Sequence, residues 1–354
     1  MRCNYCDFLT HARDYYSPEI DEYVEKLVLD IRNSKELEDI ETIYIGGGTP
    51  SYIGNKRLTS LLYSISTSIN LSNVKEFTIE ANPESLTENL VKDVYALGVD
   101  RISIGVQSFD DDILKLLGRA HDSKKAEEAI KIAKTRFDNV SIDLMCGIPG
   151  QSIESFKESL DKAISLDVQH ISVYPLSIEY NTPFYKWVSQ KRIDDVDPDV
   201  QADHMELAEQ MLEDAGFVHY EIANYARPGF ESKHNLSYWA SKPYIGFGTS
   251  ATTMTQNSER RMRVTDNHVE DDLYPPQMVA EDMMLAARTK AGISFELFER
   301  AKEHIPDVEE KLQEIIDLEL LAVTDNALVP TKRGWMCGNE LFGRLMDLCD
   351  KMPR

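Results

Sequence analysis

The chain has 354 residues, and a hydrophobic content of 42% is enough for a large α/β domain with a smaller appendage. Its 38 basic and 61 acidic residues give a formal net charge of −23, which argues against a surface for nucleic acid or an anionic membrane. No apolar stretch approaches the roughly 20 residues of a membrane span, and five unevenly spaced cysteines are no secreted disulfide framework, so we expect a cytoplasmic protein with at most peripheral membrane contact.

Short β-rich runs recur along the first half, each followed by polar or glycine-rich residues and then by a segment of helical periodicity. We expect strands at 42–45, 76–79, 101–104, 140–144 and 170–174, and helices at 21–37, 57–69, 87–97, 124–136 and 153–166. Thr87, Ser123 and Ser152 are predicted N-caps, and Gly98 lies just past a predicted helix end.

Strands that alternate with helices imply βαβ units and a parallel sheet. Their spacing suits a (β/α) barrel, complete or partial, although an open doubly wound sheet is the alternative. Unusual polar and glycine-rich segments lie at the carboxyl ends of the strands, at 46–48, 80–83, 107–109 and 143–150. In a barrel these ends meet at one mouth, where the site belongs. We therefore expect a partial (β/α) barrel, and because Cys3 already lies in a loop, we expect it to lack its first strand.

The pattern loosens in the second half of the chain. A helix over 200–215 stops at Gly216, Pro275-Pro276 open another helix, and a hairpin is expected around Asp325-Asn326. This order of helices and a hairpin resembles a winged helix. We expect three parts: the barrel at 1–216, a connecting segment at 217–274, and a C-terminal, mainly helical, winged-helix-like domain at 275–354.

Cys3 and Cys6 stand three positions apart, which is half of a metal or redox site. A zinc site, a redox pair and two ordinary thiols all remain open on this motif alone, although Cys337 and Cys349 are badly spaced to complete a zinc site.

The Gly46-Gly47-Gly48-Thr49-Pro50 segment follows a predicted strand, and its glycines let the backbone approach a ligand closely. A plain turn between strand and helix is the alternative. The segment lacks the P-loop and dinucleotide-binding spacings, so phosphate binding is disfavoured.

Several short motifs occur in a fixed order along almost the whole chain. They are Cys3-Asn-Tyr-Cys6-Asp-Phe, the GGGTP loop, Glu80-Ala-Asn-Pro, Gly105-Val-Gln-Ser-Phe, Leu117-Gly-Arg-Ala-His121, Asp143-Leu-Met-Cys-Gly-Ile-Pro-Gly-Gln151 and His234-Asn-Leu-Ser-Tyr-Trp239. Each motif is weak to moderate by itself, whereas the ordered set is specific. The chain thus resembles the radical S-adenosylmethionine (SAM) proteins related to oxygen-independent coproporphyrinogen III oxidase.

The resemblance implies a [4Fe–4S] cluster held by three thiolates in a C-x3-C-x2-C motif, with SAM on the fourth iron. Cys3 and Cys6 match the second and third thiolates of that motif. The first would fall two residues before Met1, so we expect weak or absent cluster binding unless Met1 is internal. A truncated, cluster-deficient homologue is therefore one alternative.

The resemblance also assigns the glycine loop to SAM. Gly47, Gly48 and Thr49 would hold the methionine amino group through backbone oxygens and nearby polar atoms. Glu80 would add an acceptor for the same ammonium. Taken alone, Glu80 has the alternative role of a helix cap.

Three further residues would complete the SAM site. Arg119 would pair with the methionine carboxylate, because a guanidinium matches a carboxylate in bidentate geometry. Gln107 and Asp143 would bind the ribose hydroxyls. Taken alone, Arg119 has the alternative of a surface ion pair, and Asp143 that of a helix cap.

Two features indicate a branch of the family. Coproporphyrinogen oxidases of this family carry another cysteine where this chain has Phe8, and Cys6-Asp7-Phe8 resembles the HemW-like branch, whose members are heme chaperones. The HNxxYW motif, His234 to Trp239, matches the same branch.

This resemblance implies that His234 contacts heme or another tetrapyrrole, as an iron ligand through a neutral imidazole or as a hydrogen-bond donor. Taken alone, the motif would be a structural loop. We expect a protein that passes heme to acceptor hemoproteins; an oxygen-independent coproporphyrinogen III oxidase is the other alternative.

Overall fold

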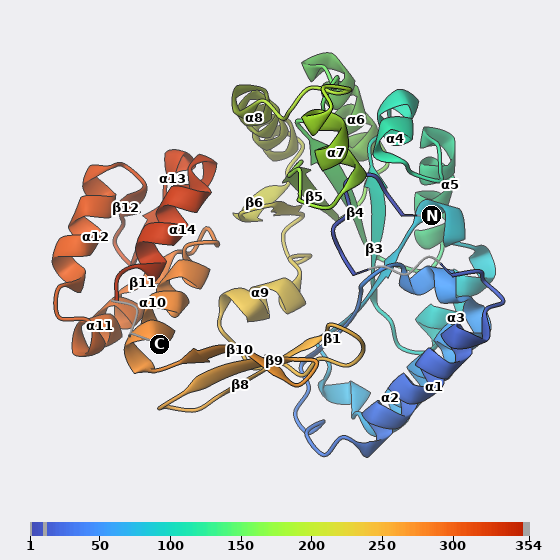
Figure 1. Ribbon diagram of the computed structural model, residues 1–354, viewed down its shortest axis with the longest axis horizontal. Coiled ribbons are helices and arrows are strands. Elements are labelled where there is room, and N and C mark those ends of the chain that lie inside the picture. The colour runs from blue at the N-terminus through green and yellow to red at the C-terminus, as the bar shows by residue number, and fades with distance from the viewer. Residues whose placement is uncertain (1, 10–12, 350–354) are drawn as a thin grey trace. The chain divides into compact units, whose positions relative to one another are not determined.

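The computed structural model describes residues 2–9 and 13–349 (Figure 1), so Met1 and the last residues of the expected C-terminal domain, 350–354, lie outside the described part. The chain forms two compact units. The first comprises Met1–His219 and Ala223–Lys233, and the second comprises Tyr220–Ile222 and His234–Arg354. Residues 217–274 contribute to both units.

A seven-stranded sheet is the centre of the first unit, with the strand order β1-β2-β3-β4-β5-β7-β6. Strands β1 to β5 are parallel, and β7 pairs with β5 in the antiparallel sense. The sheet curls into a half-barrel, as predicted, and all five expected strands are present. The strands are β1 Thr42–Ile45, β2 Glu76–Ala81, β3 Arg101–Gln107, β4 Asn139–Cys146, β5 His170–Pro175, β6 Val218–Glu221 and β7 Asn224–Ala226.

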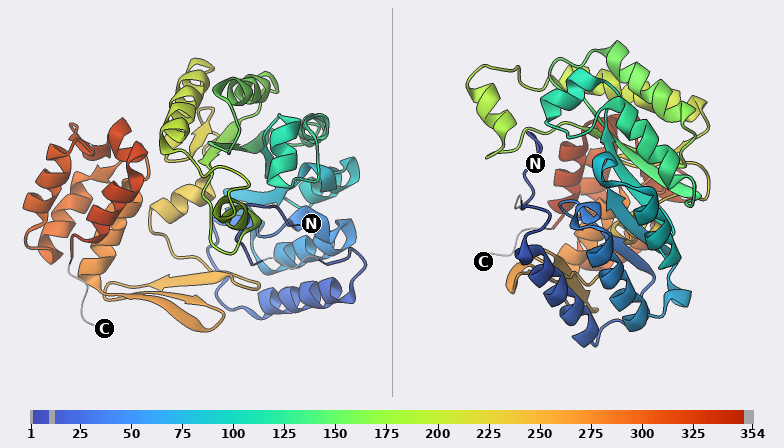
Figure 2. Two further views of the ribbon diagram at one scale, coloured as in Figure 1. Left: turned by 45° about the horizontal axis from the view of Figure 1, so that its top comes forward. Right: turned by 90° about the vertical axis from the view of Figure 1, so that its right-hand side faces the viewer.

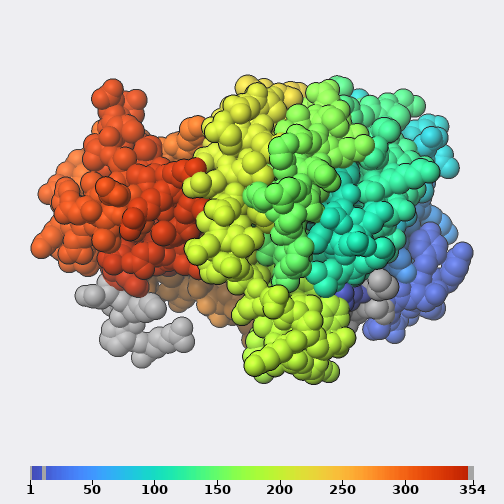
Figure 3. All heavy atoms as spheres, turned by 90° about the horizontal axis from the view of Figure 1, so that it is seen from above, coloured from blue at the N-terminus to red at the C-terminus, as the bar shows by residue number. Residues whose placement is uncertain are grey.

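Helices connect the parallel strands and lie on the outer side of the curled sheet (Figures 1 and 2). From above, the teal, green and yellow-green parts of the chain lie side by side across the surface (Figure 3). The short α4 and α7 were not predicted, because two turns are too few to show a helical period. The helices are α1 Pro18–Asn33, α2 Asn55–Ser68, α3 Glu88–Ala96, α4 Asp111–Leu117, α5 Ser123–Ala133, α6 Ile153–Ser165, α7 Pro183–Ser189 and α8 Pro198–Asp214.

Two of the three predicted helix caps are confirmed. Thr87 and Ser152 accept backbone N–H bonds at the starts of α3 and α6, and Gly98 follows α3 with a φ of +98°. The third is wrong by one residue: Asp122 caps α5, and Ser123 is the first residue of that helix. A carboxylate and a hydroxyl are both good N-caps, so the local sequence could not choose between them.

The strands of the sheet have one apolar and one polar face. In β3, Ile102, Ile104 and Val106 are each 0% exposed, and strand alternation places Arg101 and Ser103 on the opposite face. Parallel strands are usually apolar on both faces, because helices cover both. Here only the outer face is apolar, and the inner face carries polar side chains such as Arg101 and Ser103, which are themselves buried.

The second unit contains a three-stranded antiparallel meander, with the order β10-β9-β8, and a C-terminal domain. That domain begins helix, strand, helix, helix, strand, strand, with the strands in the order β11-β13-β12, which is the predicted winged-helix arrangement, and two further helices follow. The domain follows α9 Lys233–Trp239 and the meander, whose strands are β8 Thr252–Gln256, β9 Arg261–Thr265 and β10 His268–Leu273. The elements of the domain are α10 Pro275–Ala286, β11 Ile293–Ser294, α11 Phe295–His304, α12 Val308–Asp317, β12 Leu321–Val323, β13 Ala327–Pro330, α13 Lys332–Met336 and α14 Gly338–Met346.

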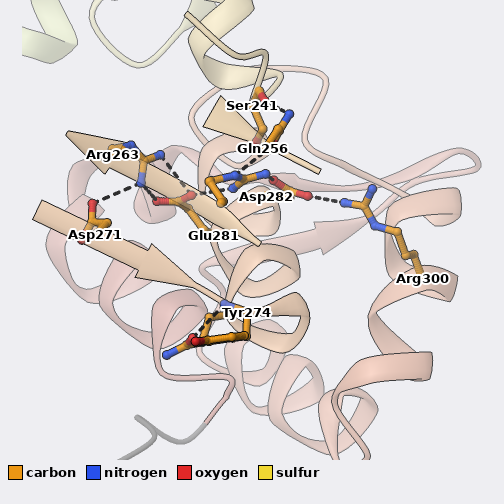
Figure 4. Close-up of polar contacts among 10 residues, drawn as sticks. Ser241, Gln256, Arg263, Asp271, Tyr274, Glu281, Asp282 and Arg300 are labelled. Atoms are coloured by element: carbon orange, nitrogen blue, oxygen red, sulfur yellow. Dashed lines mark hydrogen bonds and ion pairs between the residues drawn. The ribbon is translucent and has the colours of Figure 1, made fainter. Parts of the chain in front are cut away.

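A buried ion-pair network joins the meander to the helices of the C-terminal domain (Figure 4). Arg261 of β9, with a side chain that is 2% exposed, pairs with Glu281 and Asp282 of α10. Arg263 also pairs with Glu281, and Arg300 of α11 with Asp282. Each buried charge of α10 thus has an opposite partner on another element.

Among residues 2–9 and 13–349, no helix has both the length and the apolar character needed to cross a bilayer.

Candidate functional site

The glycine loop and the end of β2 are joined at the inner face of the sheet through Glu80. The Tyr44 hydroxyl donates to Glu80 Oε1 at 2.7 Å, and the Gly47 backbone N–H donates to the same carboxyl group. Burial raises the pKa of Glu80 to about 7, although these two hydrogen bonds lower it. Glu80 therefore lies in the sheet and faces the loop, and it does not cap a helix.

The loop itself depends on glycine for its backbone conformation. Gly47 has a φ of +114°, and a β-carbon there would meet nothing within 4 Å, so conformation and not space requires the glycine. At Gly46 a β-carbon would lie 3.0 Å from Glu80 Oε1. Gly46, Gly47 and Gly48 are exposed, so their backbone atoms are accessible to a ligand.

Arg119 is half-buried, and its guanidinium bonds groups of the first unit. Its Nη2 donates to Asn82 Oδ1 at 2.7 Å and to the Gly105 carbonyl oxygen at 2.6 Å, and Nη1 lies 3.4 Å from Cys3 Sγ. Burial opposes the charge of Arg119, but Tyr5 and Cys3 beside it outweigh burial and raise its pKa. The guanidinium is thus charged and held next to the cysteine turn, which excludes the surface ion pair.

The turn that carries both cysteines is fixed by the backbone of neighbouring helices. The Asn4 N–H donates to the Leu117 carbonyl at the end of α4, and the Phe184 N–H of α7 donates to the Asn4 carbonyl at 3.0 Å. The thiols of Cys3 and Cys6 are free and half-buried. Their sulfur chemistry fits an iron–sulfur cluster. Within the described part of the chain, however, no three His, Cys, Asp or Glu side chains converge to hold a metal ion.

Gln107 and Asp143 both lie at the mouth of the half-barrel, on neighbouring strands. Gln107 ends β3 with a φ of +69°, directly after an irregularity in the pairing with β4. Asp143 lies on β4 within 3.5 Å of Ser103 Oγ and also bonds the Ser172 side chain. Burial raises the pKa of Asp143, and its partners on two adjacent strands show that it is not a helix cap.

Asn82 also lies at this site, although the sequence analysis gave it no role. Its Nδ2 donates to Thr49 Oγ1 at 2.9 Å, and its Oδ1 accepts from Arg119. Asn82 therefore links the glycine loop to the arginine. Asn82 stands two positions after Glu80 at the end of a strand. Because side chains two positions apart in a strand point to the same face, this spacing could have indicated that Asn82 shares the face of Glu80.

The HNxxYW motif forms most of α9 in the second unit. Trp239 anchors the helix, whereas His234 and Tyr238 are partly exposed. The Trp239 Nε1–H donates to Glu221 Oε2 at 2.9 Å, and Arg288 stacks 5.2 Å from the ring centre. His234 and Tyr238, one helical turn apart, are partly exposed, with His234 Nε2 at 3.1 Å from the Tyr238 hydroxyl. The motif is thus a helix and not a loop.

A half-barrel with a glycine loop, an arginine and a cysteine turn at its mouth defines a radical SAM domain. The model of the Radical SAM superfamily matches residues 1–163. The chain is also similar to the Heme chaperone HemW of Bacillus subtilis, with 33% identity over 97% of this chain and 96% of that protein. Its identity to the Lactococcus lactis Heme chaperone HemW is 32%, over 97% of this chain and 94% of that protein. The chain therefore belongs to the family of HemW heme chaperones.

Among solved structures, the coproporphyrinogen III oxidase HemN from Escherichia coli, described as a radical SAM enzyme, has a TM-score of 0.79 with this chain. The match covers 98% of this chain and 87% of HemN, at 18% identity. It confirms the predicted fold along the chain. The matches to the family model and to the HemW proteins confirm the family resemblance predicted from the ordered motifs.

Proposed function

We propose that this protein is a cytoplasmic heme chaperone, which binds heme and passes it to acceptor hemoproteins. The observation that carries the proposal is the 33% identity over 97% of the chain to a HemW heme chaperone. Phe8 supports it, because this chain has no cysteine at the position where coproporphyrinogen oxidases of this family carry one.

We further propose that the mouth of the half-barrel binds SAM. Gly47, Gly48 and Thr49 would hold the methionine amino group, and ionised Glu80 would accept from it. Arg119 would pair with the methionine carboxylate, since its guanidinium is charged and contacts Asn82, directly after β2. Gln107 and Asp143 would bind the ribose hydroxyls.

The cysteine turn would contribute to a [4Fe–4S] cluster in this proposal. A bound cluster supplies an electron to SAM in radical SAM proteins. Cys3 and Cys6 would provide two thiolate ligands, and the Arg119 guanidinium at 3.4 Å from Cys3 Sγ would stabilise the charge of one of them.

For heme, the proposed contact is His234. An imidazole is a common axial ligand of heme iron, and this one is partly exposed on a helix that Trp239 anchors. The fit therefore rests on a partly exposed imidazole next to the Tyr238 ring.

Heme titration followed at the Soret band tests the chaperone proposal, with anaerobic porphyrinogen turnover as the parallel assay. We expect no turnover and saturable heme binding that weakens at least tenfold in His234→Ala, since even the loss of an outer partner of a metal ligand typically costs roughly 10–100-fold. His268→Ala is the matched control, because His268 is an exposed histidine of the same unit. Porphyrinogen turnover without heme binding would instead establish the oxidase alternative.

A further inference from the structure

Tyr238 contacts His234 through both its hydroxyl and its ring. The hydroxyl oxygen lies 3.1 Å from His234 Nε2, and the two ring centroids are 4.8 Å apart at an interplanar angle of 81°. A spacing of four residues places both side chains on one face of α9. The imidazole therefore has a neighbour that fixes its orientation.

Tyr238 is held in turn by Tyr244. Their ring centroids are 4.9 Å apart in an edge-to-face arrangement. Tyr244 is fixed in the backbone by two hydrogen bonds to Met254, of 3.1 and 2.9 Å, which join it to the meander. The position of the Tyr238 ring thus depends on a β-bridge, which is more rigid than a surface side chain.

Tyr244 also contacts the buried ion-pair network through Arg263. The Tyr244 side chain hydrogen-bonds Arg263, whose Nη1 and Nη2 donate to the two carboxylate oxygens of Glu281 at 2.8 and 3.0 Å. Figure 4 shows Arg263 and Glu281 in this bidentate contact. A continuous chain of contacts therefore runs from α10 to the imidazole, entirely within the second unit.

We propose that Tyr238 is the positioning residue of His234, and that Tyr244, Arg263 and Glu281 hold Tyr238 in place for that task. The proposal rests on the proposed heme contact of His234. A histidine that binds a metal through one ring nitrogen usually donates the N–H of the other to an acceptor, which fixes the ring and raises its basicity. The Tyr238 oxygen, 3.1 Å from Nε2 of His234, is placed to accept that N–H in the tautomer that carries its proton on Nε2.

The test compares heme binding by wild-type protein, Tyr238→Phe and His234→Ala, with Soret titrations and the electron paramagnetic resonance spectrum of the ferric complex. Phenylalanine keeps the ring contact and removes only the hydroxyl. We expect heme affinity to fall about tenfold in Tyr238→Phe, with a shifted axial-ligand signal, because outer partners of ligating histidines have effects of this size. Tyr63→Phe, an exposed tyrosine of α2, is the control and should behave as wild type.

Failure of this inference differs from failure of the proposed function. If His234→Ala keeps wild-type affinity and spectrum, His234 is not a heme ligand. If His234→Ala loses affinity but Tyr238→Phe keeps or gains it, His234 binds heme and Tyr238 does not position it; a gain would mean that the hydroxyl competes with iron for Nε2. Tyr244→Phe tests the outer contact, and we expect the same spectral shift with a smaller loss of affinity.

Discussion

Glu80 is a half-buried residue whose carboxyl group lies between the Tyr44 hydroxyl and the Gly47 N–H. Burial raises its pKa from the ordinary 4.5 to about 7. Because the folded pKa lies above the unfolded one, its contribution to stability is present at low pH and is lost as the pH rises from about 4.5 through 7. An ammonium group of a ligand would reverse this preference, since it favours the ionised carboxylate.

We therefore expect SAM affinity to rise with pH as Glu80 ionises. For a pKa of about 7, the ionised fraction grows about eightfold between pH 6 and pH 7.5, and affinity should follow it. Glu80→Gln should bind SAM weakly and without this pH dependence. Isothermal titration calorimetry at several pH values measures both, with the exposed Glu88→Gln as control. A pH-dependent Glu80→Gln would assign the titration to another group.

At the level of elements, α4 is the short helix that leads to the site. Asp110 caps it by accepting the N–H groups of Asp112 and Ile113 at 2.9 and 3.3 Å, and it accepts from Ser155 Oγ at 2.6 Å. The helix ends at Gly118, in the left-handed conformation, and Arg119 follows directly. The cap of α4 thus helps to place the arginine.

Asp110→Ala should lower the free energy of unfolding by about 1–2 kcal/mol, because α4 loses its cap. The hydrogen bond from Ser155 lowers the pKa of Asp110, so the contribution is present above its unfolded pKa and is lost as the pH falls through the lowered value. Denaturant unfolding at neutral pH and at low pH measures this loss. Asp112→Ala is the control in the same turn: its ion pair with Lys115 is exposed and should contribute little. Equal losses in both variants would contradict the capping role.

At the scale of the whole molecule, the two units are stabilised differently. The first has a curled sheet with helices on its outer face, whereas the second joins a meander and a winged-helix-like domain through the ion pairs of Figure 4. Glu281 is central to that network, because it accepts from both Arg261 and Arg263. Removing its charge would leave two buried or half-buried guanidinium groups underpaired.

Glu281→Gln should therefore destabilise the second unit by about 3–5 kcal/mol, the range for breaking a buried ion pair. Arg300→Gln provides the comparison, since Arg300 is 50% exposed and its loss should be under about 1 kcal/mol. Denaturant unfolding measures the difference, and hydrogen exchange should place the increased opening in residues 252–286. Similar losses for the two variants would show that burial does not set the strength of this network.

The sequence by itself determined the parallel strands β1 to β5, most of the helices, two caps and the family, because each depends on local periodicity, local hydrogen bonding or ordered motifs. Through the resemblance it also predicted Glu80 and Arg119 as SAM-binding residues, which remains a prediction. It missed α4, α7 and the meander, where short elements carry weak patterns.

Only the tertiary structure decided which of these residues meet. Asn82 joins Thr49 to Arg119 across three segments of the chain, and Tyr238 meets Tyr244 because a β-bridge to Met254 places it there. Such contacts depend on strand register and on the packing of distant segments. No local propensity encodes them, because each partner is equally compatible with many other neighbours until the sheet and its helices assemble.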